Sequence, residues 1–520
     1  KDIYKKGIYK SIYDPTAGTG GMLSVSQEFI ERQNPDANIE LFGQEYNPES
    51  YAICCSDLLI KDEPIDNLVY GDTLGVKNAK AKANNYMPRD GHPGKQFHYM
   101  LANPPFGVEW KTEKDFVEEE YNDQGFDGRF GAGLPRINDG SLLFLQHMIS
   151  KMHASPEQKG DGSKIAIVFN GSPLFTGDAG SGESNIRRWI IENDWLDAIV
   201  ALPDQMFYNT GIFTYIWLVN NKKPKERKGK VQLIDGTQHY QKMKKSLGNK
   251  RNELGDEHIA ELVKLYGENK HNAKSQKRIC SKIFDNRDFG FLKMTVERPL
   301  RLNFQVSAER IELLKQQGAF LSLATSKKTR NTKAAATEIA IGQHYQQEFL
   351  KVLSGIGGKK LFKNRDEFEG VLDKALKKEG LKLPTPLRKA VYSALSERDP
   401  SADICCYKDG KPEADSELRD TEIVPLPANF KLPLPLGYDN ETGHDKLLKL
   451  VKAHCEDYLK REVLQHVSDA WIDHSKTKVG YEIPLNRHFY VYQPPRELGD
   501  IEADIKGLEK EIMAMLSEVV

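Results

Sequence analysis

Four polar residues recur at a nearly constant spacing in the first hundred residues, and this spacing constrains the fold more than any other feature. Asp14, Glu45, Asp72 and Asn103 each follow a short apolar run, at intervals of 31, 27 and 31 residues. A strand–helix–strand unit takes roughly 30 residues, so each residue is expected at the carboxyl end of a parallel strand. Ligands of open α/β sheets bind in the crevice at that edge. The spacing therefore predicts an α/β fold with these side chains in its binding site.

Alternating strand and helix patterns continue to about residue 222. Residues 140–153 have apolar side chains at helical spacing, and Asp139 can cap the start of this helix. The remaining patterns predict one further helix at 184–194 and three strands at 164–170, 196–203 and 214–221. The strand at 214–221 is expected to be the last of the sheet and antiparallel to its neighbour.

The size and charge of the chain limit the partners that it can bind. Its 520 residues are enough for several domains, at roughly 100 to 200 residues per domain. The formal net charge is −1, which excludes a uniformly basic polymer-binding protein. Contact with nucleic acid must therefore come from local patches or from a partner.

Cysteine usage and hydropathy indicate a reducing, aqueous compartment. The six cysteines include two vicinal pairs and no CxxC spacing, which argues against a zinc ribbon and a disulfide framework. No apolar stretch approaches the roughly 20 residues of a membrane span, and no signal peptide opens the chain. The chain lacks an initiator Met and begins just before a strand pattern. We therefore expect a fragment whose natural N-terminal portion is absent.

The turn "DPTAGTGG" at residues 14–21 places small residues where a backbone must approach a ligand closely. It departs from the GxGxxG fingerprint, and the chain has no GK[ST] motif, so a phosphate-cradling site is disfavoured. An acid such as Glu45 at a second strand end commonly accepts hydrogen bonds from ribose hydroxyls. Asp72, at the third strand end, could accept a hydrogen bond from the amino group of an adenine. These acidic strand ends favour a cationic cofactor that contains adenosine.

The stretch "ANPPF" ends the fourth predicted strand with two consecutive prolines. Two prolines remove two backbone donors and fix two φ angles, so they stop a strand and stiffen the turn that follows. Asn103 and Phe106 are then placed to hold a planar group that carries an amino substituent, between hydrogen bonds and a ring face. The alternative is a stiff loop with no role in binding.

These motifs resemble those of a known family. "DPTAGTGG" followed by "NPPF" is similar to the S-adenosylmethionine-binding and catalytic motifs of DNA methyltransferases that act on the adenine amino group. Later segments, among them "NDGSLLFLQHMI", "DAIVALPDQMFYNTGIFTYIWLVNN" and "GYEIPLNRHFYVYQPPRELGD", resemble the modification subunit of type I restriction–modification systems. The resemblance implies a Rossmann-like methyltransferase core with a mixed, mostly parallel sheet and a mainly helical C-terminal extension. The family's N-terminal helical domain and "TP" motif have no counterpart here.

The resemblance also implies the cofactor, S-adenosylmethionine, and the residues of its site. Asp14 is implied near the methionine part, Glu45 at the ribose and Asp72 at the adenine. The implied cofactor-binding residues are Asp14, Pro15, Thr16, Ala17, Gly18, Thr19, Gly20, Gly21, Glu45, Asp72, Thr73, Leu74 and Asn103. No metal ligands are implied.

Catalysis is assigned to Asn103, Pro104, Pro105 and Phe106. The resemblance implies that the Asn103 side-chain oxygen and the Pro104 carbonyl would accept the two N–H bonds of a flipped adenine, that Pro105 would hold the turn, and that Phe106 would stack on the base. Methyl displacement needs orientation more than acid–base catalysis. This agrees with the lack of a convincing His, Cys or Ser constellation in the sequence.

The implied partners are double-stranded DNA, a specificity subunit that reads the DNA sequence, and a second modification subunit. The full complex would add a restriction subunit. The implied location is the prokaryotic cytoplasm. Phe126, Arg129 and Phe130 lie in a Gly-rich loop that we expect to contact DNA, unless it is a disordered surface insertion. A heptad seam near the C-terminus predicts a helix that docks onto the specificity subunit, or else folds onto its own domain. The seam residues are Ile501, Ile505, Leu508, Ile512 and Met515.

We expect a catalytic core at 1–222, a basic linker and continuation of the core at 223–317, an inserted helical module at 318–430, and a C-terminal region at 431–520. The predicted activity is that of a site-specific, adenine-specific DNA methyltransferase. Two alternatives remain open: an amino-group methyltransferase that acts on protein glutamine or RNA, and a non-catalytic interaction subunit.

Overall fold

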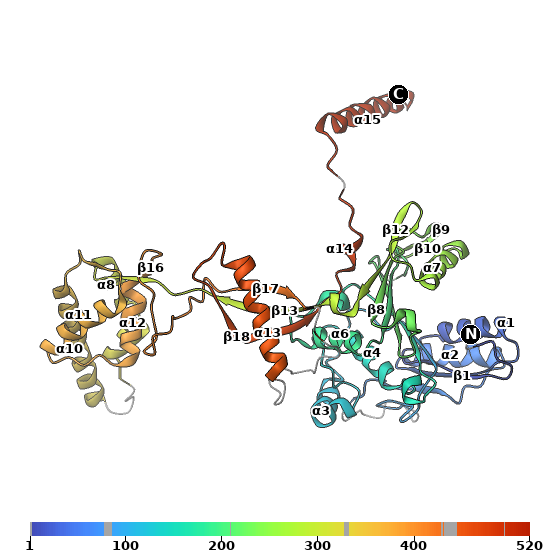
Figure 1. Ribbon diagram of the computed structural model, residues 1–520, viewed down its shortest axis with the longest axis horizontal. Coiled ribbons are helices and arrows are strands. Elements are labelled where there is room, and N and C mark those ends of the chain that lie inside the picture. Colours follow the sequence, from blue (N-terminus) through green and yellow to red (C-terminus); the bar gives the residue numbers. More distant parts are fainter. Residues whose placement is uncertain are drawn as a thin grey trace. The chain divides into compact units, whose positions relative to one another are not determined.

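The computed structural model describes residues 3–76, 86–208, 210–326, 332–427, 430, 445–492 and 494–519 (Figure 1). The chain forms two compact units. The first unit contains Lys1–Phe291, Leu426–Gly437 and Val479–Val520. The second unit contains Leu292–Pro425 and Tyr438–Lys478. The second unit is therefore inserted into the sequence of the first.

A ten-stranded sheet among the described residues organises the first unit, in the order β11-β12-β8-β6-β7-β5-β4-β1-β2-β3. Strands β1 to β5 are parallel to their neighbours in this group, and β7 lies antiparallel between β5 and β6. The strands are β1 Tyr9–Asp14, β2 Asn38–Glu45, β3 Leu68–Tyr70, β4 Tyr99–Ala102, β5 Lys164–Phe169, β6 Leu196–Ala201, β7 Tyr215–Asn220, β8 Lys230–Asp235, β11 Ala273–Ser275 and β12 Arg278–Asp285. The mixed, mostly parallel sheet and the antiparallel orientation of β7 are confirmed.

The prediction that β7 is the last strand of the sheet is wrong. Strand β8 pairs in parallel with the other edge of β6, and β12 and β11 extend the sheet beyond it. Five of the six side chains of β8 are buried. This short strand follows a charged segment, so its sequence pattern is weak although its tertiary environment is apolar.

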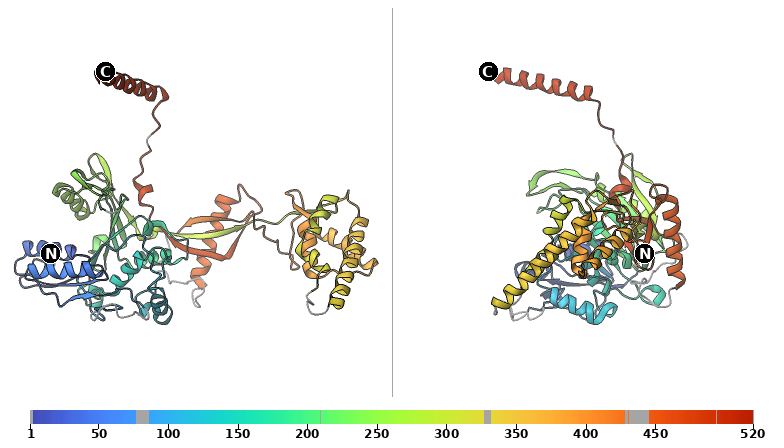
Figure 2. Two further views of the ribbon diagram at one scale, coloured as in Figure 1. Left: turned by 180° about the vertical axis from the view of Figure 1, so that it is seen from behind. Right: turned by 90° about the vertical axis from the view of Figure 1, so that its left-hand side faces the viewer.

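Helices cover the sheet where its side chains are apolar. The helices α1 (Gly21–Gln33) and α2 (Pro48–Ile60) pack on β1, β2 and β3 through a cluster that includes Ile12, Leu23 and Leu58 (Figures 1 and 2). The Asn47 side chain caps α2 by accepting from the backbone N–H groups of Glu49 and Ser50. The other α-helices of the first unit are α3 Lys114–Gln124, α4 Ser141–Ser150, α5 Ser172–Phe175, α6 Gly182–Glu192, α7 Asp256–Glu268, α14 Leu485–Phe489 and α15 Leu498–Val519, and its remaining strands are β9 Gln241–Leu247 and β10 Lys250–Glu253.

The basic run at 220–230, which includes the start of the linker expected at 223, connects β7 to β8, and two of its cations are buried. Lys223 donates to Asp194 at 2.7 Å, and Arg227 donates to Asp197 at 3.1 Å. Both cations are less than 10% exposed. The linker interpretation is therefore wrong, because two buried ion pairs hold this run inside the first unit.

The segment around Tyr481 and Ile483 packs on α6 and completes the first unit. Arg187 on α6 is buried and donates to the Tyr481 carbonyl at 2.6 Å, and the Ser184 hydroxyl accepts from the Tyr481 N–H at 3.0 Å. Burial lowers the pKa of Arg187 to about 10. The Ile483 N–H donates to the carbonyl of Leu174, at 2.9 Å. Arg187 also donates to the nearby carbonyls of Pro173 and Thr176, so the segment at Tyr481, 294 residues away, supplies one of the three acceptors of this buried cation.

The second unit has a helical core and two small sheets. Its core contains Phe304, Phe349, Phe368 and Leu395, and the rings of Phe304 and Phe368 stack at 4.7 Å. The sheets have the orders β17-β13-β18 and β15-β14-β16. The elements are β13 Gly290–Glu297, β14 Leu302–Gln305, α8 Ala308–Lys315, α9 Gly318–Leu321, α10 Thr332–Ile356, β15 Leu361–Phe362, α11 Arg365–Lys378, α12 Thr385–Leu395, β16 Ser396–Arg398, β17 Asp420–Pro425, α13 Asp445–Tyr458 and β18 Trp471–Tyr481.

The boundary between the units at Phe291 differs from the boundaries expected at 222, 317 and 430. Strand β13 pairs with β17 and β18, which follow it by more than a hundred residues, and this long-range pairing leaves no local signal in the sequence. Within the described part of the chain, no helix combines the length and hydropathy that crossing a bilayer requires.

Ile167→Ala is expected to destabilise the first unit by about 2–5 kcal/mol, since the substitution leaves a cavity in a close-packed core. Ile167 is fully buried on β5, whereas Ile60 at the end of α2 is 84% exposed. Ile60→Ala makes the same chemical change and should cost under about 0.5 kcal/mol. Calorimetric unfolding of both variants measures the difference, and equal losses would contradict this account of the core.

Candidate active site

The carboxyl ends of β1, β2, β3 and β4 surround a cavity of about 530 Å³. Its volume is in the range of small-molecule sites. The lining residues are Pro15, Thr16, Gly18, Glu45, Tyr46, Asp72, Thr73, Leu74, Asn103, Pro105, Val108, Glu109, Trp110, Thr112, Glu113, Gly140 and Phe144. Asp14 and Glu45 end their strands, and Asp72 and Asn103 follow theirs within two residues. The predicted positions of these residues at one edge of the sheet are confirmed.

The Gly-rich turn after β1 is held by its own hydrogen bonds and by a close approach to α2. Asp14 is 1% exposed, and its carboxylate accepts from the Thr16 N–H at 2.9 Å and from the Thr16 hydroxyl at 3.3 Å. Burial raises the pKa of Asp14 to about 7, although the Thr16 bonds oppose this shift. Gly20 has a φ of 82°, and a Cβ there would lie 2.7 Å from the Sγ of Cys54. Only glycine fits this position without strain.

The carboxylate of Glu45 joins the first two loops of the site. One of its oxygens accepts from the Gly18 N–H and the other from the Asn47 N–H, both at 2.7 Å. Glu45 also lines the cavity. Its position in the wall of the cavity is therefore fixed by backbone donors on both sides.

The carboxylate of Asp72 organises the loop after β3 in the same way. It accepts from the N–H groups of Leu74 and Gly75, both at 2.9 Å, and burial raises its pKa. The neighbouring Thr73 hydroxyl donates to the Pro15 carbonyl at 2.6 Å. The loops after β1 and β3 are thus tied together next to the cavity.

The turn after β4 presents Asn103 at the surface of the cavity. Asn103 and Pro105 line the cavity and are exposed, whereas Pro104 is buried. Within the residues that the structure describes, the Asn103 side chain makes no hydrogen bond, so its amide oxygen and nitrogen are available. The half-buried ring of Phe106 lies edge-to-face with Phe207, with centroids 6.1 Å apart.

Some predicted site residues lie outside the lining. Ala17 packs in the apolar cluster under α1, and Gly20 contacts Cys54. The predicted residues that do not line the cavity are Asp14, Ala17, Thr19, Gly20, Gly21, Pro104 and Phe106. The sequence analysis missed the segment after the proline turn, from Val108 to Glu113, and Phe144 on α4. The aromatic and acidic residues that directly follow "NPPF" were the available signal.

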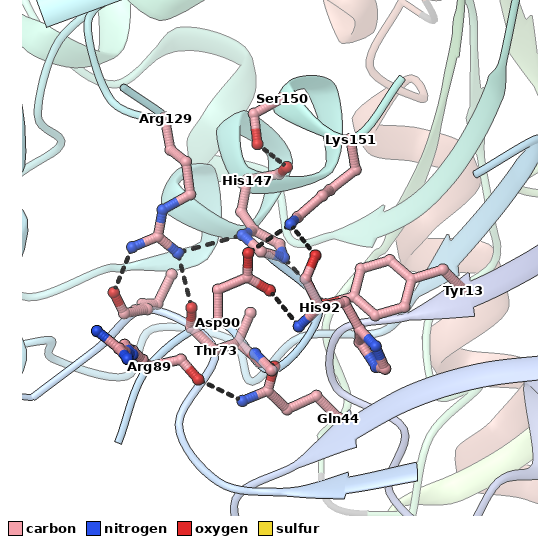
Figure 3. A network of polar contacts seen from close by, with 12 residues as sticks. Tyr13, Gln44, Thr73, Arg89, Asp90, His92, Arg129, His147, Ser150 and Lys151 are labelled. Atoms are coloured by element: carbon pink, nitrogen blue, oxygen red, sulfur yellow. Dashed lines mark hydrogen bonds and ion pairs between the residues drawn. The ribbon is translucent and has the colours of Figure 1, made fainter. Parts of the chain in front are cut away.

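Arg129 and Phe130, expected to contact DNA, are both engaged inside the first unit, and the structure corrects this assignment. The Arg129 guanidinium pairs with both Glu120 oxygens at 2.7–3.1 Å. It also donates to the Thr73 carbonyl (Figure 3) and to the Leu74 carbonyl. Phe130 is fully buried. Phe126 is 58% exposed and remains a candidate. The glycines around these residues resemble an exposed loop in sequence, although the loop folds inward.

A buried polar network extends from Arg129 towards β1 (Figure 3). An Nη of Arg129 lies 3.2 Å from His147 Nδ1, and His147 Nε2 lies 3.0 Å from the Tyr13 hydroxyl. Burial and the nearby guanidinium hold the pKa of His147 well below its usual value, so the ring is neutral. Since arginine only donates, Nδ1 accepts and Nε2 carries the proton. Lys151 pairs with Asp90 in the same network. The network fixes the end of β1 and the loop after β3 relative to each other.

Two further features bear on ligands and partners. Among the described residues, no group of three or more His, Cys, Asp or Glu side chains could hold a metal ion. The predicted seam of α15 is exposed on the helix, with exposed fractions from 38% at Ile501 to 59% at Met515. This leaves a continuous apolar stripe on a helix of 22 residues.

Comparison with known proteins identifies relatives of the chain. The family model described as N-6 DNA Methylase matches residues 2–292. The HindI type I restriction enzyme methylase subunit of Haemophilus influenzae is 32% identical over 228 residues, which are 44% of this chain and 44% of that protein. The MjaIX methylase subunit of Methanocaldococcus jannaschii is 29% identical over 264 residues, which are 49% of this chain and 40% of that protein.

A type I methyltransferase subunit of known structure, from Streptococcus thermophilus, is 25% identical, with a TM-score of 0.42 over 55% of this chain and 51% of that one. The chain spans less than half the length of the two curated relatives that it matches. The family model, however, covers more than half of the chain and includes every strand of the large sheet. The chain therefore belongs to the N-6 DNA methylase family.

Proposed function

We propose that the chain is the modification subunit of a type I restriction–modification system, which transfers a methyl group from S-adenosylmethionine to the N6 amino group of adenine in DNA. The observation that carries this proposal is the unpartnered amide of Asn103, held on a proline turn at the edge of a cavity with acidic walls. Family membership and the relatives named above support it.

The charge of the cavity suits the proposed cofactor. Four carboxylate side chains line it, and the lining within the described residues contains no lysine or arginine. S-adenosylmethionine, when bound, supplies an electrophilic methyl group on a sulfonium and carries a second positive charge on its ammonium. Glu45 retains lone pairs for ribose hydroxyls, and Asp72 lies where it can accept from the adenine amino group. Asp14 is assigned to the methionine part.

The adenine amino group is a poor nucleophile because its lone pair is delocalised into the ring. Asn103 and its turn would increase its reactivity. The Asn103 side-chain oxygen and the Pro104 carbonyl would accept the two N–H bonds, which draws the lone pair out of conjugation. The Phe106 ring would stack on the base, which must be flipped out of the duplex to reach this turn. The chain's own residues therefore orient the nucleophile, and orientation is the main requirement of a direct displacement.

The exposed seam of α15 is assigned to partner binding. Five apolar side chains at heptad spacing on one helix match a coiled-coil surface. We assign its partner as a helix of the specificity subunit, which would read the DNA sequence. A second modification subunit and a restriction subunit would complete the assembly.

Asn103→Ala is expected to lower methyl transfer to DNA by at least about 10²-fold, the typical effect of removing one hydrogen bond made in the transition state. Affinity for S-adenosylmethionine should fall by less than about tenfold, since one neutral hydrogen bond is worth about 1 kcal/mol. Asn122→Ala on the exposed face of α3 is the control. Labelled-methyl transfer with the specificity partner and calorimetric titration of the cofactor measure both effects. Retained transfer in Asn103→Ala would refute the catalytic assignment.

Cofactor affinity is expected to rise with pH up to about 7 because of Asp14. Its carboxyl has a pKa of about 7 in the free protein, so below this pH it holds a proton. A cation bound nearby favours the ionised form, and binding then releases the proton. Affinity should therefore increase by up to about tenfold per pH unit below pH 7 and level off above it. Calorimetry from pH 5.5 to 8 tests this, and an unchanged pH dependence in Asp14→Asn would contradict it.

The double variant Ile505→Ser and Leu508→Ser is expected to weaken assembly with the specificity subunit by more than about a hundredfold, because two apolar anchors lose about 1.5–3 kcal/mol each. The control is Lys506→Ser with Lys510→Ser, on another face of α15. Co-purification and sedimentation measure assembly, and cofactor binding should be unchanged in both variants. Equal assembly of the two double variants would show that the seam is not the docking surface.

A further inference from the structure

A two-stranded hairpin, formed by β9 and β10, has no apolar face. Six of the seven side chains of β9 are exposed, and only Met243 is half-buried. Strand β10 pairs with β9 alone, in an antiparallel ribbon with one irregularity. Isolated two-stranded ribbons are marginally stable in water. Packing of a core therefore does not account for this hairpin, and its position must be fixed by other contacts.

The hairpin is anchored to the loop that follows β6. The N–H of Asn249 donates to the Tyr208 carbonyl at 2.9 Å, and the N–H of Arg251 donates to the Gln205 carbonyl at 3.0 Å. The buried side chain of Asn252 donates to the Asp204 carbonyl at 2.9 Å.

A glycine at the turn of the hairpin allows this close seating. Gly248 has a φ of 60°, and a Cβ there would lie 2.6 Å from the Tyr208 carbonyl oxygen. The ribbon is thus held by its backbone and one buried amide, and six of the seven β9 side chains stay exposed.

The same loop reaches the catalytic turn. Strand β6 is antiparallel to β7, which is antiparallel to β5, so the carboxyl ends of β6, β5 and β4 lie at one edge of the sheet. Phe207 in the loop contacts Phe106 edge-to-face. The adjacent Tyr208 is 72% exposed. The hairpin is therefore connected to the ring assigned to the target base through one short, hydrogen-bonded loop.

The hairpin carries five cations within ten residues: Lys242, Lys244, Lys245, Lys250 and Arg251. In the described part of the chain, none of the five forms an ion pair. Lys242 lies over the Tyr240 ring at 5.3 Å, and the one carboxylate of the hairpin, Glu253, accepts from Gln241. This local excess of positive charge contrasts with a chain whose net charge is −1. The buried cations of the run at 220–230 have carboxylate partners, whereas these do not.

We propose that the β9–β10 hairpin binds the phosphate backbone of the DNA duplex next to the flipped adenine. This inference rests on the proposed function, since it takes DNA as the substrate. Lysine and arginine side chains contact phosphates without reading sequence, and a two-stranded ribbon has the dimensions to follow a DNA groove. The hairpin would fix the duplex relative to Asn103 and leave sequence recognition to the partner.

The experiment compares two pairs of adjacent lysines in the full chain, assembled with its specificity partner. The hairpin variant is Lys244→Gln with Lys245→Gln, and the control is Lys5→Gln with Lys6→Gln. Lys5 and Lys6 are also exposed but precede β1, at the amino ends of its parallel strands. Both variants remove the same charge. Fluorescence anisotropy with a labelled duplex gives DNA affinity as a function of salt, and labelled-methyl assays give kcat and KM.

The hairpin variant should bind DNA at least about tenfold more weakly at low salt, and the slope of log affinity against log salt should fall by about 2, the value for two lost phosphate contacts. The KM for DNA should rise while kcat and cofactor affinity stay unchanged, and Lys244→Glu with Lys245→Glu should show a larger effect. The control should match the wild type.

Equal slopes for the hairpin variant and the control would overturn the proposal. Loss of the specificity partner with unchanged DNA binding would also overturn it, because it would make the hairpin a protein contact. The salt titration does not depend on catalysis. A wild-type complex that binds DNA through the hairpin but methylates no duplex would therefore refute the proposed function alone.

Discussion

The parallel alignment of β3, β2, β1 and β4 is the constraint on which the site depends. Parallel neighbours need crossover connections, and here α1 and α2 supply two of them and bury the apolar face of the strands. Chain order reverses beside β1, so the loops after β1 and β4 diverge and leave a crevice between them. Two acids, Glu45 and Asp72, and the amide of Asn103 line this crevice because each lies at the end of a strand, while the buried Asp14 holds the turn after β1. The direction of the strands therefore determines where the site lies, and the side chains determine its chemistry.

Within that crevice, each loop is held by groups from another loop. Glu45 at the end of β2 accepts from the N–H of Gly18, Thr73 after β3 donates to the carbonyl of Pro15, and Arg129 donates to the carbonyl of Thr73. Arg129 depends on Glu120, because both side chains are only 11% exposed and removal of one would leave the other charge without its partner in a largely desolvated position. The binding surface is therefore ordered by the protein before a ligand arrives, which lowers the cost of ordering it on binding.

Sequence reasoning located the parts of the site that depend on local pattern. The spacing of Asp14, Glu45, Asp72 and Asn103 reflects the length of a strand–helix–strand unit, and the structure confirms their placement. Arg129 could not be placed in this way, because its partner Glu120 and the carbonyls that it binds belong to other elements. The cations at 223 and 227 were misread for the same reason, since Asp194 and Asp197 precede them by about thirty residues. The pairing of strand β13 could not be predicted either, because its partners β17 and β18 lie far along the chain.

The hydrogen bonds between Tyr481 and α6 have a consequence for the folding of the chain during its synthesis on the ribosome. Residues of α6 emerge early, together with the Pro173 and Thr176 carbonyls that accept from Arg187, but a third acceptor of the buried guanidinium, the Tyr481 carbonyl, is synthesised much later. Until that segment is synthesised, the large sheet carries a desolvated cation with an incomplete set of acceptors. The first unit therefore reaches its native state only after the whole second unit has been translated. Nascent chains that stop short of this point would remain substrates for chaperones and proteases, whatever the intrinsic stability of the sheet.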